Sequence, residues 1–399
     1  MVARKISDLM SELVETPGIS KHEEEIGNLV ESKIKSSVDR VFRDDFKPAP
    51  NVLAEKKGTS GKYKLVVDYH IDQIGLEILD IKENGLLDVR TMGGMGRVDG
   101  YDFDIYTPKG KVKSKAKIDF GSYPSRKSPD GKAPAGREDL DTLNLNGKPR
   151  PIGSGDYPLM AYGLFLEVPG IKSKADAETA GIQVGQQAIY SMNDNKTDGT
   201  VFTSPAMDDR VGTAIGIKCA KGLAKTPTKS TVLYAGTAQE ELGLYGAAHV
   251  AKTSAKGYDV AIALDVSFAD SQAKPGQGPI LLLRDAYMSI DAKAKYLLEE
   301  AAKREGIKLQ PQKIGGGATN AARYKSAGIA AGTLAIPTQY IHSEKETVDL
   351  RDVTAAVKVL NRAITDSEDI LDSYAKENHG EGSYAKVPVA GRMVSAIKK

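Results

Sequence analysis

The chain has 399 residues, and its 55 basic and 53 acidic side chains leave a formal net charge of only +2. The two signs are well mixed, which argues against nucleic acid as a partner. A single cysteine, Cys219, excludes an intrachain disulfide framework and a cysteine-based zinc site.

No stretch of the sequence has the composition of a membrane segment. The first residues lack the apolar core of a signal sequence, and no later run offers the ~18 uncharged apolar residues of a membrane span. We therefore expect a soluble, cytoplasmic protein without a membrane partner. Cys219 lies in an apolar helical run and is expected to be a small core residue.

Two helices are predicted at the start of the chain. Apolar residues recur at helical spacing over 6–14, and again from residue 26 to residue 34. Ser20 and Glu23 form a capping-box pattern in front of the second helix. His22 lies in that first turn among glutamates, where a solvated surface position is expected.

The strand predicted at 64–67 runs directly into His70 and Asp72. These residues are two apart, so they lie on the same face of an extended chain. A histidine can ligate a metal through one nitrogen while a nearby carboxylate fixes its tautomer. Taken alone, the pair is better explained as a hydrogen-bonded core histidine and its neighbour.

From about residue 75 to residue 187 the sequence changes character. Glycine and proline become frequent, and apolar runs become short and alternating, which predicts an inserted β-rich module. Within it, the polar segment 122–155 is expected to be a long loop or partly disordered. The remaining chain is then divided into a main domain made of 1–74 and 188–374, and a basic tail at 375–399, including His379, that is expected to be poorly ordered.

A helix is predicted to open at Asp208 and Asp209. One acidic residue in a first helical turn is an ordinary partner of the helix dipole. That explanation accounts for one of the two aspartates and leaves the other available for a site.

Beyond this helix, strands and helices alternate regularly. Such units predict an α/β fold with a mostly parallel central sheet flanked by helices on both faces. Sites in these sheets lie at the carboxyl ends of the strands. Glu240, Glu241, Asp265 and His342 all fall at predicted strand ends or in the loops that follow them.

The polar residues at strand ends form a set of nitrogen and oxygen donors. The candidate ligands are His70, Asp208, Glu241, Asp265 and His342. Such a set suits Zn, Mn or Co, and five ligands are too many for one tetrahedral catalytic ion. They match two ions ~3.5–4 Å apart that share a bridging carboxylate and a bridging water. Glu240 would then be free to take a proton from that water and pass it to a leaving amine.

Six segments in order resemble the motifs of the M42 family of metallo-aminopeptidases, which includes the tetrahedral and glutamyl aminopeptidases. The segments are 16–23, 70–75, 208–212, 239–243, 265–266 and 340–343, and the resemblance extends from about residue 6 to residue 372.

The resemblance implies a hydrolase that removes N-terminal residues from peptides. It also implies two divalent metal ions per subunit, with Zn as the first expectation and Co or Mn as the alternatives. Asp208 would bridge the ions. His70 and Asp265 would complete one site, and Glu241 and His342 the other. Glu240 would be the general base and acid, and Asp72 would support His70.

The resemblance also implies an assembly. The module at 75–187 is similar to the family's dimerisation domain, through which dimers build hollow tetrahedral particles. Two positions depart from the family pattern, because Gln73 and Asn320 stand where the family usually has Glu and Asp.

Two alternatives remain open. The first is a homologue that keeps the fold and the assembly but is non-catalytic or has altered specificity, to which Gln73 and Asn320 lend weight. The second is a glycosidase that uses Glu240 and Asp265 as acid and base, which would leave both histidines and Asp208 without a role.

Overall fold

The computed structural model describes residues 2–96, 98–119, 163–192 and 196–378. The helices of this part are α1 (Val2–Glu15), α2 (Glu24–Ile34), the short 3₁₀ helix η1 (Lys35–Ser37), α4 (Lys174–Thr179), α5 (Met207–Leu223), α6 (Tyr245–Lys252), α7 (Ala292–Arg304), α8 (Ala321–Ser326), α9 (Leu350–Thr365) and α10 (Ser367–Asn378). The first nine strands are β1 (Arg40–Arg43), β2 (Val52–Lys56), β3 (Lys64–His70), β4 (Gly75–Ile81), β5 (Leu87–Met92), β6 (Asp102–Thr107), β7 (Gly110–Asp119), β8 (Gly163–Glu167) and β9 (Gln187–Tyr190). The later strands are β10 (Lys196–Asp198), β11 (Val201–Ser204), β12 (Thr231–Thr237), β13 (Val260–Phe268), β14 (Ile280–Arg284), β15 (Gln310–Lys313), β16 (Ala330–Thr338) and β17 (Glu346–Asp349).

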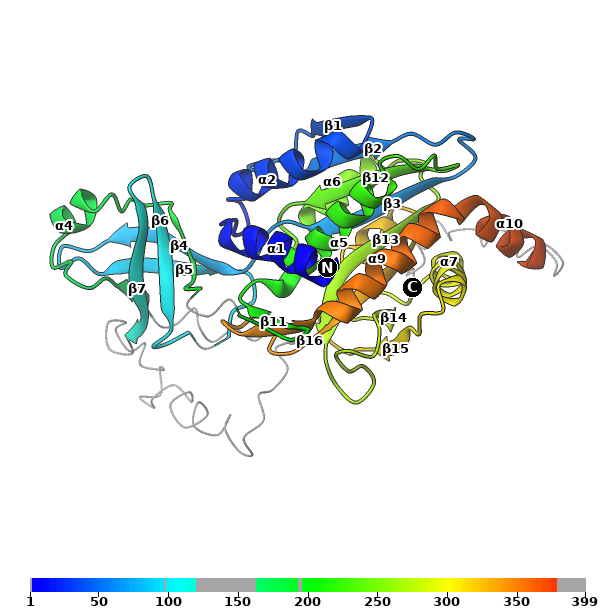
Figure 1. Cartoon of the computed structure of the whole chain (residues 1–399). Coiled ribbons are helices and arrows are strands. Elements are labelled where there is room, and N and C mark those ends of the chain that lie inside the picture. The colour runs from blue at the N-terminus through cyan, green and yellow to red at the C-terminus, as the bar shows by residue number, and fades with distance from the viewer. Residues whose placement is uncertain (1, 97, 120–162, 193–195, 379–399) are drawn as a thin grey trace, which may run out of the picture.

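An eight-stranded sheet forms the larger body of the molecule (Figure 1), with the strand order β1-β2-β12-β3-β13-β16-β14-β15. The four central strands β12, β3, β13 and β16 pair in parallel. The edge is antiparallel at β1 and β2, and β14 runs antiparallel to β16. The predicted α/β class is confirmed, as a mixed sheet with its parallel strands at the centre.

Helices cover both faces of this sheet, and alternate residues of each central strand face opposite layers. In β13, Val260, Ile262 and Leu264 join the large core cluster that includes α5, α7 and α9. Ala261 and Ala263 point to the other face, where they pack with residues of α6 and α8. Burial on both faces explains why this strand reads as a nearly continuous apolar run.

A closed barrel with the strand order β4-β5-β8-β7-β6-β9 forms the smaller body and has a core cluster of its own. It lies at one end of the molecule, on the left in Figure 1, with α10 at the opposite end. The chain enters the barrel directly after β3 and returns through a small sheet of β10, β11 and β17 to α5.

Two predicted segments fall wholly or partly outside the described residues. The excursion at 122–155 does so entirely, and so does the tail from residue 379, with His379. Residues 375–378 were predicted to begin the poorly ordered tail, but they belong to helix α10, which continues to Asn378.

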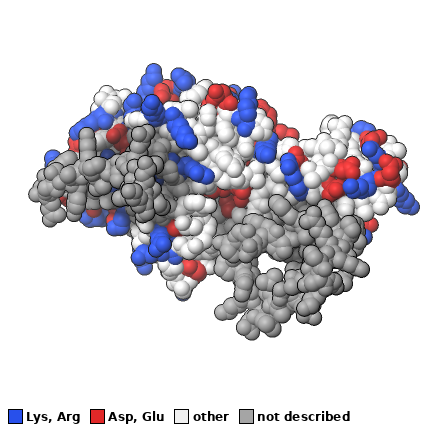
Figure 2. All heavy atoms as spheres, turned by 180° about the vertical axis from the view of Figure 1, so that it is seen from behind, with Lys and Arg blue, Asp and Glu red and all other residues white. Residues whose placement is uncertain are grey.

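The surface carries charges of both signs. Basic and acidic side chains are interspersed on the face that Figure 2 shows, in keeping with the balanced composition. Within the described ranges, no helix combines the length and the apolar composition that crossing a lipid bilayer requires.

Candidate metal centre

The parallel register brings the predicted site residues to one edge of the sheet. His70 ends β3 and lies opposite Thr237, the last residue of the neighbouring β12. Asp265 lies on β13, which pairs with both β3 and β16. The loops after β12 and β16 carry the remaining residues, and the start of α5 carries Asp208.

Six of the predicted residues form two groups of metal-donor atoms. His70, Glu240 and Asp265 make up the first donor triad, and Asp208, Glu241 and His342 make up the second donor triad. In each triad the three donor atoms lie within 4.8 Å of one another.

Asp208 faces both triads with its two carboxylate oxygens. Its Oδ1 lies 2.9 Å from His70 Nε2, and its Oδ2 lies 3.2 Å from His342 Nε2. One carboxylate therefore has an oxygen toward each triad, which is the geometry that a bridging ligand requires.

Glu240 lies closer to the candidate ligands than the sequence analysis expected. The sequence predicts a free proton carrier, whereas the Glu240 carboxylate lies within 4.8 Å of donor atoms of His70 and Asp265. A carboxylate in this position could ligate an ion or exchange a proton beside it.

Asp72 lies beside the triads and organises the chain that carries two of their members. Its Oδ1 accepts the Glu240 N–H at 3.0 Å, and its Oδ2 accepts the Glu241 N–H at 3.2 Å. The ring of His70 is closer to the backbone oxygen of Asp72, at 3.1 Å from Nδ1, than to its carboxylate, at 3.4 Å. Asp72 therefore fixes the histidine mainly through its main chain.

The capping box predicted at Ser20 and Glu23 does not form. Helix α2 begins at Glu24, and Glu23 makes no side-chain cap hydrogen bond. Ser20 Oγ instead donates to Asp72 Oδ2 at 2.5 Å, and Glu23 Oε1 accepts the Gln239 N–H at 3.0 Å. Tertiary partners at the site replace the local cap. Burial and the charge of Asp72 raise the pKa of Glu23 to about 8.

The two aspartates at the start of α5 have different tasks. Asp209 Oδ1 accepts the Gly212 N–H at 2.9 Å and so caps the helix. Asp208 has non-helical backbone angles, φ −81° and ψ 104°, and its side chain is directed to the triads.

Glu346 is a residue that the sequence analysis missed. Only 1% of it is exposed, and its carboxylate accepts the N–H groups of Asp208 at 2.9 Å and His342 at 2.6 Å. Burial and the charge of Asp208 raise its pKa to about 8. The alternation of buried Glu346 and Val348 along β17 was the available signal, hidden by the charged residues around it.

The acidic side chains of the two triads lie close together and are buried, and both conditions shift their pKa values. Burial raises the pKa values of Glu240, Asp265 and Glu241. Burial also raises the pKa of Asp208, but hydrogen bonds from His342 and His70 outweigh it, and the net shift is well below the usual range.

Burial has the opposite effect on the pKa values of the two histidines. Burial alone would lower the pKa values of His70 and His342, but the charge of Glu240 beside the first and of Glu241 beside the second raises both well above their ordinary value. Each imidazole therefore favours its protonated form beside a buried acid. Divalent cations would supply positive charge and displace the protons.

The chemistry of the donors fits divalent ions. Glu241 Oε1 is buried and lacks a hydrogen-bond donor among the described residues, although His342 Nε2 lies 3.3 Å away. A buried carboxylate oxygen without a donor is costly unless a cation satisfies it. Imidazole nitrogens and carboxylate oxygens are the donors that Zn, Co and Mn accept.

The two unusual residues noted in the sequence have structural partners. Gln73 Oε1 accepts a hydrogen bond at 2.6 Å from the fully buried guanidinium of Arg210, whose pKa burial lowers to about 10. Asn320 Nδ2 donates to the buried carboxylate of Asp68 at 2.8 Å. An amide at position 320 is therefore matched to a carboxylate, where a second acid would repel it.

The barrel reaches the second donor triad through the turn after β5. Gly93 has φ +87°, and a Cβ added there would lie 3.1 Å from Glu241 Cβ and 2.7 Å from Ile74 Cγ2.

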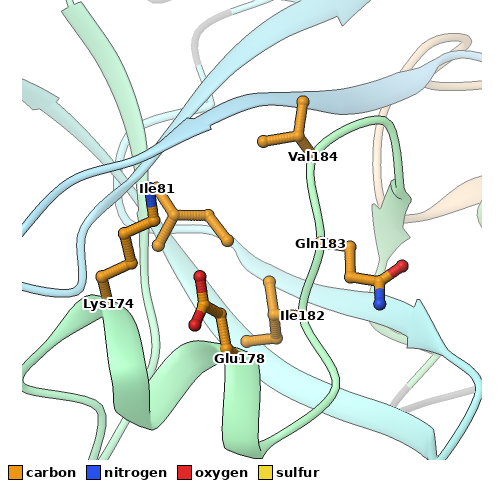
Figure 3. Close-up of a pocket in the computed structure, with 6 residues that line it drawn as sticks. All are labelled: Ile81, Lys174, Glu178, Ile182, Gln183 and Val184. Atoms are coloured by element: carbon orange, nitrogen blue, oxygen red, sulfur yellow. The ribbon is translucent and has the colours of Figure 1, made fainter.

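A separate hollow of about 440 Å³ on the barrel is lined by Ile81, Lys174, Glu178, Ile182, Gln183 and Val184 (Figure 3). None of the predicted site residues lines it.

Fold and site together define an α/β protein of the metal-dependent enzyme type, whose carboxylates and imidazoles gather at the carboxyl ends of parallel strands. More narrowly, the chain belongs to the M42 glutamyl aminopeptidase family, whose model matches residues 50–118 and 163–359. This confirms the family predicted from the six motifs, and it makes the protein a peptidase.

Individual relatives cover nearly the whole chain. A lysyl aminopeptidase of Pyrococcus furiosus is 28% identical over 366 residues, which span 88% of this chain and 94% of the relative. The aminopeptidase structure from Desulfurococcus kamchatkensis has a TM-score of 0.78 at 28% identity and covers 97% of this chain and 100% of that one. The Pyrococcus horikoshii TET1 peptidase, described as assembling into a tetrahedron or a large octahedral shell, has a TM-score of 0.72 at 25% identity, with 90% and 99% covered.

Proposed function

We propose that the protein is an aminopeptidase that holds two divalent ions, one at each donor triad, and removes N-terminal residues from peptides. The observation that carries this proposal is the pair of triads with Asp208 between them, because one carboxylate then faces two sets of donors. His70 and Asp265 would hold one ion, and Glu241 and His342 the other.

The chemistry divides between the ions and the protein. When bound, two divalent ions polarise the scissile carbonyl and make a water more acidic. Glu240 takes a proton from the attacking water and returns it to the leaving amine. Asp72 holds the Glu240 and Glu241 backbone in place, and Asp208 supplies negative charge shared by both triads.

Metal removal is the first test of this proposal. Dialysis against a chelator should abolish hydrolysis of a panel of aminoacyl p-nitroanilides, and Zn, Co or Mn should restore it. Metal analysis of the active protein should find two ions per chain. Full activity in chelated protein with less than one ion per chain would refute the proposal.

The Glu240→Gln variant separates the two roles open to this residue. If Glu240 carries the proton, kcat should fall by about 10²- to 10⁴-fold while two ions stay bound. If the variant binds only one ion, Glu240 is a ligand of the first donor triad instead. Glu305→Gln is the matched control, because Glu305 forms a surface ion pair with Arg362. An unchanged kcat in Glu240→Gln would refute the proton-carrying role of Glu240, and a metal-loaded parent that hydrolyses none of the substrates would favour the non-catalytic alternative.

We infer in addition that the module at 75–187 is a dimerisation domain and that 1–74 and 188–374 form the catalytic domain. The separate core of the barrel supports this division. Leu79 and Val184 are large apolar residues of the module that are 44% and 59% exposed, as an interface between subunits requires. Assembly of the related TET1 peptidase into a tetrahedron or a large octahedral shell supports self-association into dimers and larger particles.

A further inference from the structure

Glu346 is a buried acid that belongs to neither donor triad and yet contacts two members of the second. Its Oε2 accepts the Asp208 N–H at 2.9 Å, and its Oε1 accepts the His342 N–H at 2.6 Å. The side chain is 1% exposed, so water does not compete for these hydrogen bonds. One carboxylate thus connects the start of α5 to the loop after β16.

Both amides belong to irregular backbone. His342 has φ +65°, a left-handed conformation that few residues other than glycine adopt. Asp208 has non-helical angles although it lies inside the bounds of α5. Buried N–H groups need an acceptor, and here neither a helix nor a sheet ladder provides one. Glu346 satisfies both through its two carboxyl oxygens.

Only a carboxylate can fill this position. Its two oxygens accept two N–H groups at once, whereas an amide side chain offers one oxygen and would turn its own N–H₂ toward the other donor. Asp72 makes the corresponding pair of bonds to Glu240 and Glu241. The backbones of all three members of the second donor triad are therefore held by carboxylates outside that triad.

We propose that Glu346 is a positioning residue that sets the backbones of Asp208 and His342 so that the second donor triad can hold a divalent ion. This inference rests on the proposed function, because it assigns a supporting role at the same centre. Glu346 touches neither substrate nor ion and acts through the two residues whose amides it binds.

The Glu346→Gln variant tests the proposal through metal binding. Metal-free protein is titrated with Co²⁺ and followed by calorimetry and by the visible absorption of bound cobalt. One of the two ions should bind about 10- to 100-fold more weakly than in the parent, because removing a hydrogen bond that orients a ligand typically has this effect. The other ion should be affected less. Saturating Co²⁺ should restore most of kcat.

Three results would overturn the proposal. Parent affinities for both ions in Glu346→Gln would show that the two hydrogen bonds do not position the ligands. Equal weakening of both ions, or a kcat that saturating Co²⁺ does not restore, would indicate a general structural role. Glu305→Gln should match the parent in every measurement.

Two further controls keep the outcome interpretable. If Glu346→Gln does not fold, Glu346→Asp replaces it under the same criteria, since it keeps the carboxyl group but is one methylene too short to reach both amides. If the parent protein itself binds no Co²⁺, the proposed function fails. Two ions in the parent and unchanged binding in the variant would refute the role of Glu346 alone.

Discussion

Buried carboxylates in this protein repeatedly accept backbone N–H groups from segments that have no regular hydrogen-bond ladder. Asp72 and Glu346 do so at the donor triads, and Asp352 does so away from them. Asp352 accepts the Gly276 N–H at 2.6 Å and the Gly278 N–H at 2.7 Å, which ties the connection between β13 and β14 to α9. Burial nevertheless outweighs these bonds and raises the pKa of Asp352 to about 6.

The raised pKa of Asp352 predicts a specific pH dependence of stability. The folded-state pKa of about 6 exceeds the reference value of 3.8, so the folded protein binds this proton more tightly than the unfolded chain does. The contribution of Asp352 to the free energy of unfolding should therefore be largest below the reference pKa and decline as the pH rises through the folded pKa.

Urea unfolding of the parent and of Asp352→Asn at several pH values measures this effect. The difference in unfolding free energy, parent minus variant, should decrease from the reference pKa of 3.8 until the pH has passed through the folded pKa of about 6, and stay constant at higher pH. A difference that grows with pH would show that the two glycine amides stabilise the carboxylate more than burial destabilises it.

Individual site residues differed in how far the sequence could predict them. His70, Asp265 and Glu241 were predictable because a buried strand fixes which residues reach its carboxyl end. Glu346 and the orientation of Glu23 were not, since both depend on N–H groups that become available only when distant segments meet. The same local pattern, Ser20 followed by Glu23, would cap a helix if those partners were absent.

At the scale of elements, the spacing of apolar residues could not predict the direction in which β14 runs. Parallel neighbours require a crossover, usually a helix, whereas the connection between β13 and β14 at 269–279 contains no helix. β14 consequently runs antiparallel to its neighbour β16. The central parallel strands were predictable because each alternates with a helix along the chain.

The turn after β5 gives a second prediction, because Gly93 has positive φ and lies against Glu241. A methyl group in Gly93→Ala should displace Glu241 and lower the affinity of the second donor triad for its ion, with kcat/KM reduced about 10- to 100-fold. Hydrolysis kinetics at several Co²⁺ concentrations measure this change.

Gly100→Ala is the matched control for that variant. Gly100 has φ +82°, close to the +87° of Gly93, but an added Cβ there would meet nothing within 4 Å. Both variants should lose about 1 kcal/mol of stability through the backbone. Parent-like kinetics and metal affinity in Gly93→Ala would show that the contact with Glu241 has no functional role.

At the scale of the whole molecule, the proposed self-association predicts the native mass. Native mass spectrometry should find even multiples of the 42.7 kDa subunit. Val184→Glu should shift the distribution to smaller species, because a charge placed in an apolar interface is costly. Val201→Glu, at a valine of β11 that is 37% exposed, should leave it unchanged. A parent protein found only as a monomer would contradict the proposal.

Two segments of the chain connect the barrel to the larger body, and the places where they join that body determine where a pulling force would act. The outgoing chain leaves immediately after His70, and the returning chain runs through β11 into the start of α5 beside Asp208. Traction on the barrel, whether from a neighbouring subunit or from a single-molecule pulling experiment, is therefore delivered at the backbone next to these two side chains.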